Sequence, residues 1–586
     1  MSPRWGMFLL PVLCNWWSGV AAPLHRLVVT TQGAVRGYYA PQPPHYVYRG
    51  VPYARPPTNY DRFKPIPAKC LRGMRDSKCL YWLYYVFRCT QAPEPPPPWS
   101  GIFEATHRVR CPQPDGSGEE NCLVLNIFVP ERAAASPVLV HFHGGGFQRG
   151  SVLRSRCKNS IEIFRWGFHT GPRRLLEQGF VVVSFNYRLG VLGFLCLGLP
   201  DVLGNTGLKD QIAALYWIHR NIDKFGGDPG DVTAYGTGSG AVSIELLQLS
   251  GFTKNLFGKV ILESGSAFSP SAISHEPTSD AFNFAKELGY KYDSKPVLLQ
   301  EFFYKVSYKS ISNTSYSFLP CIESEDFTNS LILKDPRDGN NAKHQNVPTM
   351  VIYTNADEVS IIAENMDRFN AIPHNFENLL PSNLVFDSDK TKNKVANIVK
   401  EFYFDDYTIT KNVVQSYISY VNDVFMEYPV VKSAAYHANN GNVVYLMKYL
   451  YEGKLSSKKY GIPGANFGDI LKFITSNVHL EDSDEIVSEK LITLLNNFIR
   501  LGDPTPLTTL LIPEVWQPLV PYTVNNKIVL RNVPCLTFRQ SMTNSLLSGQ
   551  QLVFWDHIYE KHNLECHKVP TWGPYCSWPL LMIFPR

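Results

Sequence analysis

A run of glycines behind an apolar segment is the first feature of this sequence that could take part in chemistry. His143-Gly144-Gly145-Gly146-Phe147 directly follows the apolar run 137–142. Glycine has no side chain and lets a backbone approach a bound atom closely. Backbone N–H groups aimed at one point make an oxyanion hole, which stabilises negative charge on a carbonyl oxygen during acyl transfer. The loop therefore indicates acyl-transfer chemistry, with a purely structural glycine turn as the alternative.

A longer series of motifs surrounds this loop. It comprises YRGVPYA at 48–54, RFKP at 62–65, NYRLG at 186–190, GNTGLKDQ at 204–211, Trp217, FGGDP at 225–229, ESGS at 263–266 and FWD at 554–556. In this order and spacing the series resembles the type-B carboxylesterase and cholinesterase family from Leu27 to Lys561. The resemblance implies an α/β-hydrolase fold, with a large, mostly parallel central sheet flanked by helices. It implies no cofactor.

The family places its nucleophile in a G-x-S-x-G elbow, on a sharp strand-to-helix turn. The matching segment here is Gly236-Thr237-Gly238-Ser239-Gly240, so Gly238 stands in the place of the serine. Glycine cannot attack a carbonyl. The resemblance assigns Gly145, Gly146 and the backbone of Ser239 to an oxyanion-hole-like cluster. A shifted nucleophile at Ser239 is disfavoured, because one step along the turn points its side chain elsewhere.

Of the two other triad positions, the acid matches the family and the histidine does not. The acid of the family matches Glu358 in Asn355-Ala356-Asp357-Glu358 and is retained. The histidine of the family matches Phe467 in Gly464-Ala465-Asn466-Phe467-Gly468-Asp469, and a phenyl ring cannot relay a proton. Glu358 would then face an apolar ring, and an unpaired buried carboxylate is costly. We expect Glu358 to be neutral, to find a new hydrogen-bond donor or to be reached by water.

The elements that must position these residues can be read from the pattern of apolar runs. Short β-branched runs that end in glycine or polar turns lie at 137–142, 180–185, 231–235, 259–262, 348–353 and 442–447. The segment 211–221 has helical periodicity instead. Such an alternation predicts a buried, mostly parallel sheet with intervening helices. Sites in open sheets of this kind lie at the carboxyl ends of the strands.

The ends of the chain suggest export. Arg4, the apolar stretch 5–17 and the small residues that follow predict a secretory signal peptide over 1–22. The esterase-like domain is expected over 23–562, followed by a C-terminal tail over 563–586. Two stretches look foreign to the pattern, 69–91 and 152–169, and each is either a surface insertion or a translated intron. We expect a secreted, extracellular protein.

Cysteines and a sequon fit that compartment. The chain has 12 cysteines, and Cys14 leaves with the signal, so the odd remainder implies at least one free or intermolecular thiol. The resemblance pairs Cys111 with Cys122, and no cysteine pairs match the other two disulfides typical of cholinesterases. Asn313-Thr314-Ser315 is an N-glycosylation sequon. No spacing matches a common zinc pattern, so no metal site is expected.

Three functions follow from the lost nucleophile and histidine. The first is recognition of another extracellular protein, since catalytically dead relatives such as neuroligins, neurotactin and glutactin act in adhesion. The second is binding of a hydrophobic small molecule in the vestigial gorge. The third is ester hydrolysis with a displaced nucleophile. The family scaffold commonly dimerises through a four-helix bundle, so such a homodimer is an expectation. The net charge of +5 argues neither for nor against a nucleic-acid partner, and no such partner is expected.

Overall fold

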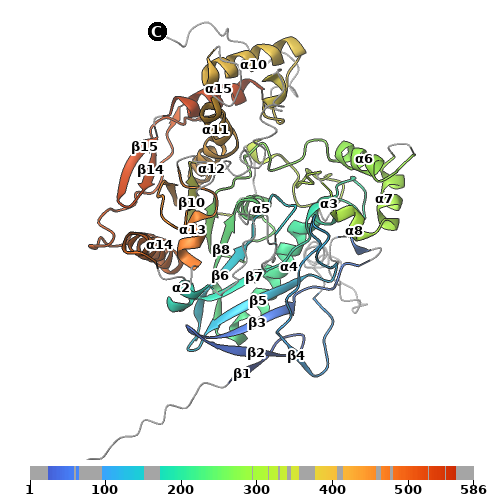
Figure 1. Ribbon diagram of the computed structural model, residues 1–586, viewed down its shortest axis with the longest axis vertical. Coiled ribbons are helices and arrows are strands. Elements are labelled where there is room, and N and C mark those ends of the chain that lie inside the picture. Colours follow the sequence, from blue (N-terminus) through green and yellow to red (C-terminus); the bar gives the residue numbers. More distant parts are fainter. Residues whose placement is uncertain are drawn as a thin grey trace, which may run out of the picture.

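The computed structural model of the chain describes residues 24–58, 61–64, 95–150, 172–292, 295–314, 316–327, 330–338, 345–355, 376–405, 413–456, 464–475, 480–524, 527–547 and 549–562. The tail and both foreign-looking stretches lie outside these residues. One large twisted sheet runs through the molecule from β1 to β15 (Figure 1). Within the described part, no helix is both long and apolar enough to cross a membrane.

The sheet has 13 strands in the order β1-β2-β3-β5-β7-β6-β8-β9-β10-β11-β14-β15, with β4 paired to β2. Neighbours from β7 to β14 run parallel, whereas β1, β2, β3 and β5 at one edge and β15 at the other are antiparallel. The strands are β1 His25–Val29, β2 Ala34–Pro41, β3 Pro44–Pro52, β4 Ile102–Glu104, β5 Val124–Pro130, β6 Ser136–Phe142, β7 Val181–Phe185, β8 Gly227–Thr237, β9 Lys259–Glu263, β10 Thr349–Thr354, β11 Val444–Tyr449, β14 Val533–Phe538 and β15 Met542–Leu547. A separate hairpin joins β12 Thr523–Val524 to β13 Lys527–Ile528.

Helices cover both faces of the sheet. They are α2 Arg173–Glu177, α3 Gly190–Phe194, α4 Thr206–Asn221, α5 Ser239–Ser250, α6 Pro277–Glu287, α7 Pro296–Lys305, α8 Tyr308–Ser312, α10 Asp389–Phe404, α11 Val414–Asn422, α12 Tyr428–Asn439, α13 Asp469–Thr475, α14 Asp482–Leu501 and α15 Gln550–His562. A π-helical turn, η7 Asp423–Glu427, joins α11 to α12, and short 3-10 turns lie at η2 Ile222–Phe225, η3 Pro336–Asp338 and η5 Phe376–Leu379.

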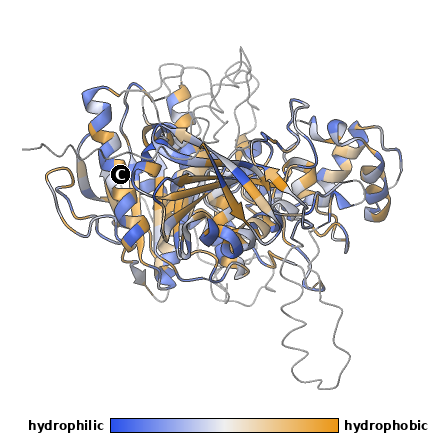
Figure 2. Cartoon of the chain, turned by 90° about the horizontal axis from the view of Figure 1, so that it is seen from below, coloured by the Kyte–Doolittle hydropathy of each residue, from blue (hydrophilic) through white to orange (hydrophobic). Residues whose placement is uncertain are grey.

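Side chains of the central strands alternate between two cores. On β7, Val181 and Val183 join the core shared with α4, α5 and α12, whereas Val182 joins the core shared with α2, α13 and α14. Successive residues of a strand point to opposite faces, so a sheet covered on both faces needs apolar residues throughout. Figure 2 shows hydrophobic residues concentrated along these strands.

The predicted fold class is confirmed. Each of the six apolar runs overlaps a strand of the parallel part of the sheet, from β6 to β11, and the helical segment 211–221 lies within α4. This arrangement places the ends of β6, β8, β9 and β10 at the same edge of the sheet, where the candidate residues of the sequence lie.

Candidate functional site

The turn between β8 and α5 keeps the backbone of a nucleophile elbow. Gly238 stands at this turn with φ 54° and ψ −120°, a conformation that favours glycine. Its N–H donates to the carbonyl of Glu263 at 2.8 Å, and its carbonyl accepts from the N–H of Val242 at 3.0 Å. A Cβ on Gly240 would lie 2.1 Å from the carbonyl oxygen of Phe142, so only glycine fits beside β6 there. The elbow is therefore held in its sharp shape without a serine.

The phenyl ring of Phe467 occupies the space where a nucleophile would begin. A Cβ built on Gly238 would lie 2.7 Å from Cε2 and 2.9 Å from Cζ of Phe467. A Cβ on Gly144 of the glycine-rich loop would lie 3.4 Å from the same Cζ. Phe467 is only 7% exposed, so the ring is packed into this place. The two positions that depart from the family pattern are thus in contact with each other.

Several hydrogen bonds fix the loop that carries Phe467. The N–H of Ala465 donates to Oδ1 of Asn355 at 3.1 Å, which ties the loop to the residue that follows β10. The N–H of Asn466 donates to Oδ2 of the buried Asp469 at 2.9 Å, at the start of α13. Lys472 donates to the other carboxylate oxygen at 2.6 Å. With its backbone held at these points, the loop keeps the ring against Gly238.

The glycine-rich loop follows β6, as expected. Gly145 and Gly146 have positive φ values of 125° and 61°, and a Cβ on Gly145 would lie 2.1 Å from the carbonyl oxygen of Arg149. Gly144 passes close to the elbow, because its own Cβ would lie 2.5 Å from the carbonyl oxygen of Thr237. The loop and the start of α5, where Ser239 lies, therefore meet at the same edge of the sheet, as the oxyanion-hole assignment of Gly145, Gly146 and Ser239 requires.

Two buried histidines lie at and just before the glycine-rich loop, and burial makes both weak bases. Burial lowers the pKa of His143 to about 4 and that of His141 to about 3. The His143 ring stacks on Tyr187 with centroids 4.3 Å apart, and the Tyr187 hydroxyl donates to the His143 carbonyl at 2.8 Å. Burial raises the pKa of Tyr187, and the hydroxyl of Ser239 partly offsets this effect. A neighbourhood of neutral, weakly basic groups gives Ser239 little help as a nucleophile.

Glu358 lies outside the described residues, so the structure does not place the retained acid. Strand β10 ends at Thr354, shortly before it. The expectation that Glu358 is neutral, finds a new donor or is reached by water stays a prediction.

A second group of triad-type residues was not found from the sequence. Glu245 on α5, with Ser433 and His437 on α12, forms a cluster that is at most 1% exposed. Both the Ser433 hydroxyl and Nε2 of His437, the latter at 3.0 Å, bond the same oxygen of Glu245. The N–H of Ala267 donates to the other oxygen at 2.6 Å. Because serine and histidine share one acceptor inside the core, the cluster binds α5 to α12 and offers no accessible nucleophile.

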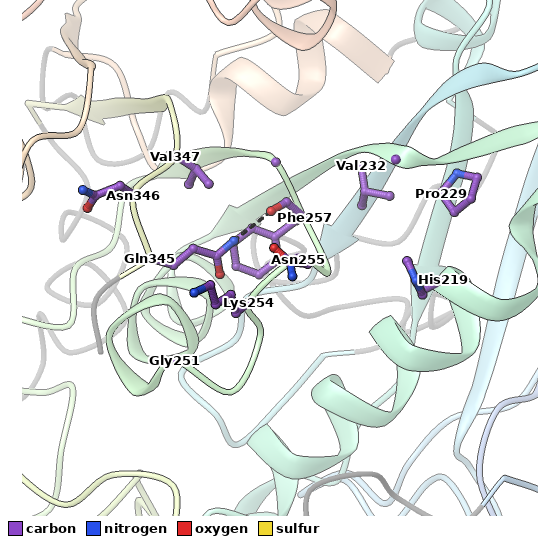
Figure 3. Close-up of a pocket in the computed structure, with 12 residues that line it drawn as sticks. His219, Pro229, Val232, Gly251, Lys254, Asn255, Phe257, Gln345, Asn346 and Val347 are labelled. Carbon is purple, nitrogen blue, oxygen red and sulfur yellow. Dashed lines mark hydrogen bonds between the residues drawn. The ribbon is translucent and has the colours of Figure 1, made fainter. Parts of the chain in front are cut away.

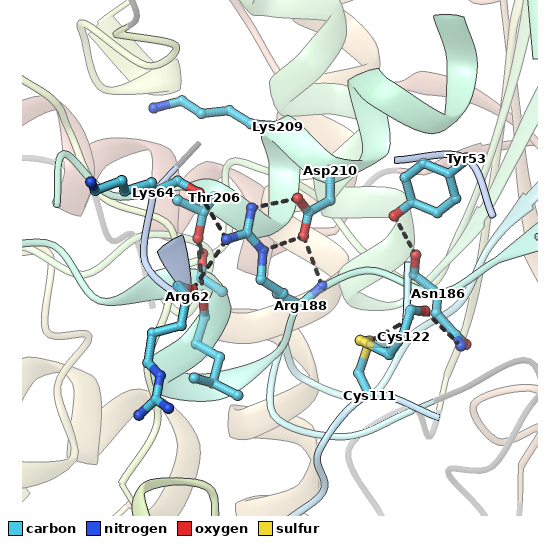
Figure 4. Close-up of polar contacts among 12 residues, drawn as sticks. Tyr53, Arg62, Lys64, Cys111, Cys122, Asn186, Arg188, Thr206, Lys209 and Asp210 are labelled. Carbon is cyan, nitrogen blue, oxygen red and sulfur yellow. Dashed lines mark hydrogen bonds and ion pairs between the residues drawn. A yellow bond between two sulfur atoms is a disulfide. The ribbon is translucent and has the colours of Figure 1, made fainter. Parts of the chain in front are cut away.

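A buried ion pair supports the glycine-rich edge of the sheet (Figure 4). Arg188, just after β7, donates through Nε to Asp210 of α4 at 2.7 Å, and both side chains are at most 2% exposed. The same guanidinium donates to the carbonyls of Arg62 and Lys64 at 3.1 and 2.8 Å. A buried pair with its remaining donors satisfied holds elements in register. Two of the family motifs, at 62–65 and 186–190, are thus joined at this point.

The structure contains two disulfides among the described residues. Cys111 and Cys122 form the expected bond, with an S–S distance of 2.06 Å. Cys196 and Cys321 form a second bond that the sequence analysis missed, because their sequence separation of 125 gives no local signal. Cys535 is free and buried, and the other cysteines lie outside the described residues. The Asn313 side chain of the sequon is exposed just after α8.

The described residues also line a groove of about 820 Å³ at the opposite edge of the sheet, with both polar and apolar side chains in its walls (Figure 3). Its walls come from the end of α4, with His219, and from the segments before β9 and β10, with Lys254 and Gln345. Gln345 donates to the carbonyl of Phe257 at 2.9 Å. The groove lies at the amino ends of the strands, away from the elbow. Within the described residues, no group of histidine, cysteine, aspartate or glutamate side chains could hold a metal ion.

Comparisons with known proteins agree with this architecture. The profile described as Carboxylesterase family matches residues 90–555. Esterase FE4 of Myzus persicae is 28% identical over 518 residues, which cover 81% of this chain and 83% of that protein. Carboxylesterase 5A of Homo sapiens is 28% identical over 483 residues, covering 79% and 78% of the two chains. The crystal structure of juvenile hormone esterase from Manduca sexta, with OTFP covalently attached, superposes with a TM-score of 0.73. It is 24% identical and covers 91% of this chain and 99% of that one.

Proposed function

The chain belongs to the carboxylesterase family, and from this premise we propose that it is a secreted, non-hydrolytic member that recognises another extracellular protein. The observation that supports the proposal is the contact between Phe467 and Gly238. An aromatic ring fills the place where the serine side chain of an active relative would start. Neither a hydroxyl nor an imidazole stands at these two positions.

The contact between Gly238 and Phe467, which stand in place of the serine and histidine of active relatives, supports a loss of ester hydrolysis. A serine placed at position 238 would lie closer to the Phe467 ring than van der Waals distance allows. Gly238→Ser alone therefore clashes with the ring, and Phe467→His alone leaves no nucleophile. A displaced nucleophile at Ser239 would need a base, and the low pKa of His143, about 4, makes that histidine a weak one. These two facts weigh against hydrolysis with an altered triad.

Binding of an apolar small molecule is the second candidate. The observation in its favour is the apolar surface that Phe467 adds to the base of the former site. Against it, the ring is only 7% exposed, so most of its surface is already used in packing. Protein recognition therefore remains the preferred function.

The test compares hydrolysis of a short p-nitrophenyl ester by three purified proteins. These are the parent, Gly238→Ser alone and the double variant Gly238→Ser, Phe467→His. We expect no turnover by the first two, and measurable turnover by the double variant if Glu358 and the glycine-rich loop serve as in active relatives. Turnover by the parent that a serine-directed phosphonate abolishes would overturn the proposal and point to Ser239.

A thermal-shift series with the parent separates the two binding candidates. Apolar esters and alcohols of increasing size should leave the Tm unchanged if the protein recognises other proteins. A saturable rise in Tm would instead favour a small-molecule ligand, because a ligand that binds only the folded state stabilises it by mass action. The same thermal-shift series with the variant Phe467→Trp is the control. Its larger ring should reduce a rise in Tm that comes from binding at the elbow.

A further inference from the structure

Strand β15 forms one edge of the large sheet (Figure 1). It pairs antiparallel with β14 through a regular register from Val533 opposite Leu547 to Phe538 opposite Met542. In the strand order nothing follows β15, so its outer side has no strand partner among the described residues. An edge of this kind presents a row of peptide groups that can pair with another strand.

A proline in β14 shows which peptide groups face outward. Pro534 lies opposite Leu546 and has no N–H, so this cannot be a pair that exchanges two backbone hydrogen bonds. Pairs that do and do not exchange such bonds alternate along an antiparallel ladder. Leu546, Asn544 and Met542 therefore turn their N–H and C=O groups away from β14, toward the outer side.

Within the described part of the chain, β15 itself carries none of the features that usually protect an edge strand from pairing. Edge strands are commonly guarded by charged side chains, proline or a bulge. The chain has no charged residue from Gln540 to Trp555, and β15 contains neither a proline nor a break in register. The opposite edge strand, β1, carries His25 and Arg26 instead. The two edges of one sheet thus differ in how open they are to another strand.

We propose that the β15 edges of two copies of this chain pair antiparallel and join their sheets into one. A two-fold axis through Asn544 would set Asn544 opposite its own counterpart and Met542 opposite Leu546 of the other copy. In this register all three outward-facing residues form hydrogen-bonded pairs. Self-pairing brings identical side chains together, and β15 itself has no charged side chain, so the nearest charge is Glu514, which accepts from the Asn544 amide at 3.3 Å.

Apolar side chains beside the strand supply further area for this contact. Leu546 is 60% exposed, Val515 42% and Leu510 fully exposed. The Asn544 amide donates to the Val515 carbonyl at 2.8 Å, which places the segment that carries Leu510 and Val515 alongside β15. A short strand edge alone buries less than the roughly 1,000 Å² of a stable interface, so these side chains must contribute.

The alternative dimer interface is a helical surface that includes α15. Val553 of α15 is 45% exposed, and a helical-bundle dimer, the arrangement expected from the family resemblance, would cover such a face. The edge proposal does not depend on whether the elbow hydrolyses esters, so its failure would leave the proposed function standing.

Sedimentation equilibrium of the full-length secreted protein tests the proposal with the variants Leu546→Lys and Val553→Lys. Both change an exposed apolar residue to lysine, so each is the control for the other, and thermal melts check that both remain folded. We expect a dimer in the parent, weakened at least about tenfold by Leu546→Lys and unchanged by Val553→Lys. A dimer that only Val553→Lys weakens, or a parent that stays monomeric, would overturn the edge pairing.

Hydrogen exchange provides a second measurement that needs no variant. The amides of Met542, Asn544 and Leu546 face outward and should become protected as protein concentration rises. The amides of Thr543, Ser545 and Leu547 point toward β14 and should be protected at every concentration. Exchange across β15 that does not depend on concentration, in a protein that dimerises, would contradict the proposal.

Discussion

Helix α5 takes part in two groups of residues, and each has only some of the features of a catalytic site. The group at its start has the backbone geometry, and the group around Glu245 has the residue types. At its start, the Gly238 turn has a sharp backbone with no side chain, and the Phe467 ring fills the space beside it. Two turns later, Glu245 gathers a serine and a histidine, yet both bond one carboxylate oxygen inside the core. The comparison shows that residue types make a site only where backbone geometry, mutual contacts and access agree.

The difference also concerns what each region contributes to the fold. The elbow is held by backbone hydrogen bonds and by the packing of an apolar ring. The Glu245 cluster is held by polar contacts that cross from α5 to α12. Burial alone would raise the pKa of Glu245, but bonds from His437, Ser433 and the Ala267 N–H lower it below its usual value.

Removing Glu245 should have the largest effect on stability. Glu245→Ala leaves His437, Ser433 and the Ala267 N–H without their acceptor in the core, which costs about 3–5 kcal/mol of unfolding free energy. Urea denaturation measures this loss. The reference is Glu104→Ala, which removes an exposed ion pair with Arg36 and should cost at most about 1 kcal/mol.

The same cluster should respond to acid. Because the folded-state pKa of Glu245 is lowered, its contribution to stability is present above the usual value of 4.5 and is lost as pH falls through the lower folded value. The parent should therefore lose stability on acidification more steeply than Glu245→Ala. Equal slopes for the two proteins would mean that the carboxylate is not held by these donors.

A smaller effect is expected at the elbow, where contact couples two positions. Gly238→Ser alone should destabilise the fold, since the new side chain meets the ring and adopts a strained backbone conformation, which costs about 1–3 kcal/mol. Phe467→Ala removes the ring and should relieve the clash. In a double-mutant cycle the combined variant should lose about 0.5–3 kcal/mol less than the sum of the single losses.

Additive losses in that cycle would show that Phe467 does not press on position 238. The matched control is Gly238→Ser combined with Phe473→Ala. Phe473 is a fully buried phenylalanine in the core of α13 and α14, and it is not among the nearest neighbours of a Cβ on Gly238. Its combination with Gly238→Ser should therefore be additive.

A second buried carboxyl, that of Asp423, has a pKa shift in the direction opposite to that of Glu245. Asp423, in the π-helical turn η7, is 8% exposed, and burial together with the nearby Glu427 raises its pKa to about 7. The Tyr403 hydroxyl, which donates at 2.9 Å, and Lys448 oppose this shift only in part. Glu245, with more donors, shows the opposite direction.

The sign of the effect follows from the raised value. The folded chain holds this proton more tightly than the unfolded chain, so the contribution of Asp423 is present below its usual pKa of 3.8 and is lost as pH rises through about 7. Asp423→Asn should flatten the fall in stability between about pH 4 and about pH 7. Urea denaturation across that range measures it, with the exposed Asp223→Asn as a control that should keep the slope of the parent.

Much of the fold was predictable because its signals are local. Apolar runs that end in glycine or polar turns predicted six strands of the parallel sheet, and helical periodicity predicted α4 from residue 211 to its end. The glycine-rich loop at 144–146 could be assigned because a backbone that approaches a bound atom closely favours glycine. The sequence could not give the second disulfide, since Cys196 and Cys321 are brought together only by folding.

By itself the sequence determined the family, the parallel sheet and the absence of a serine and a histidine from their expected positions. Each of these depends on residue identity at a fixed place in a local pattern. Only the tertiary structure decided that the Phe467 ring packs on Gly238, and that Glu245 meets Ser433 and His437 from sequence separations of 188 and 192. Such contacts depend on how distant segments pack, because many distant partners are compatible with the same local pattern and only the folded chain selects among them.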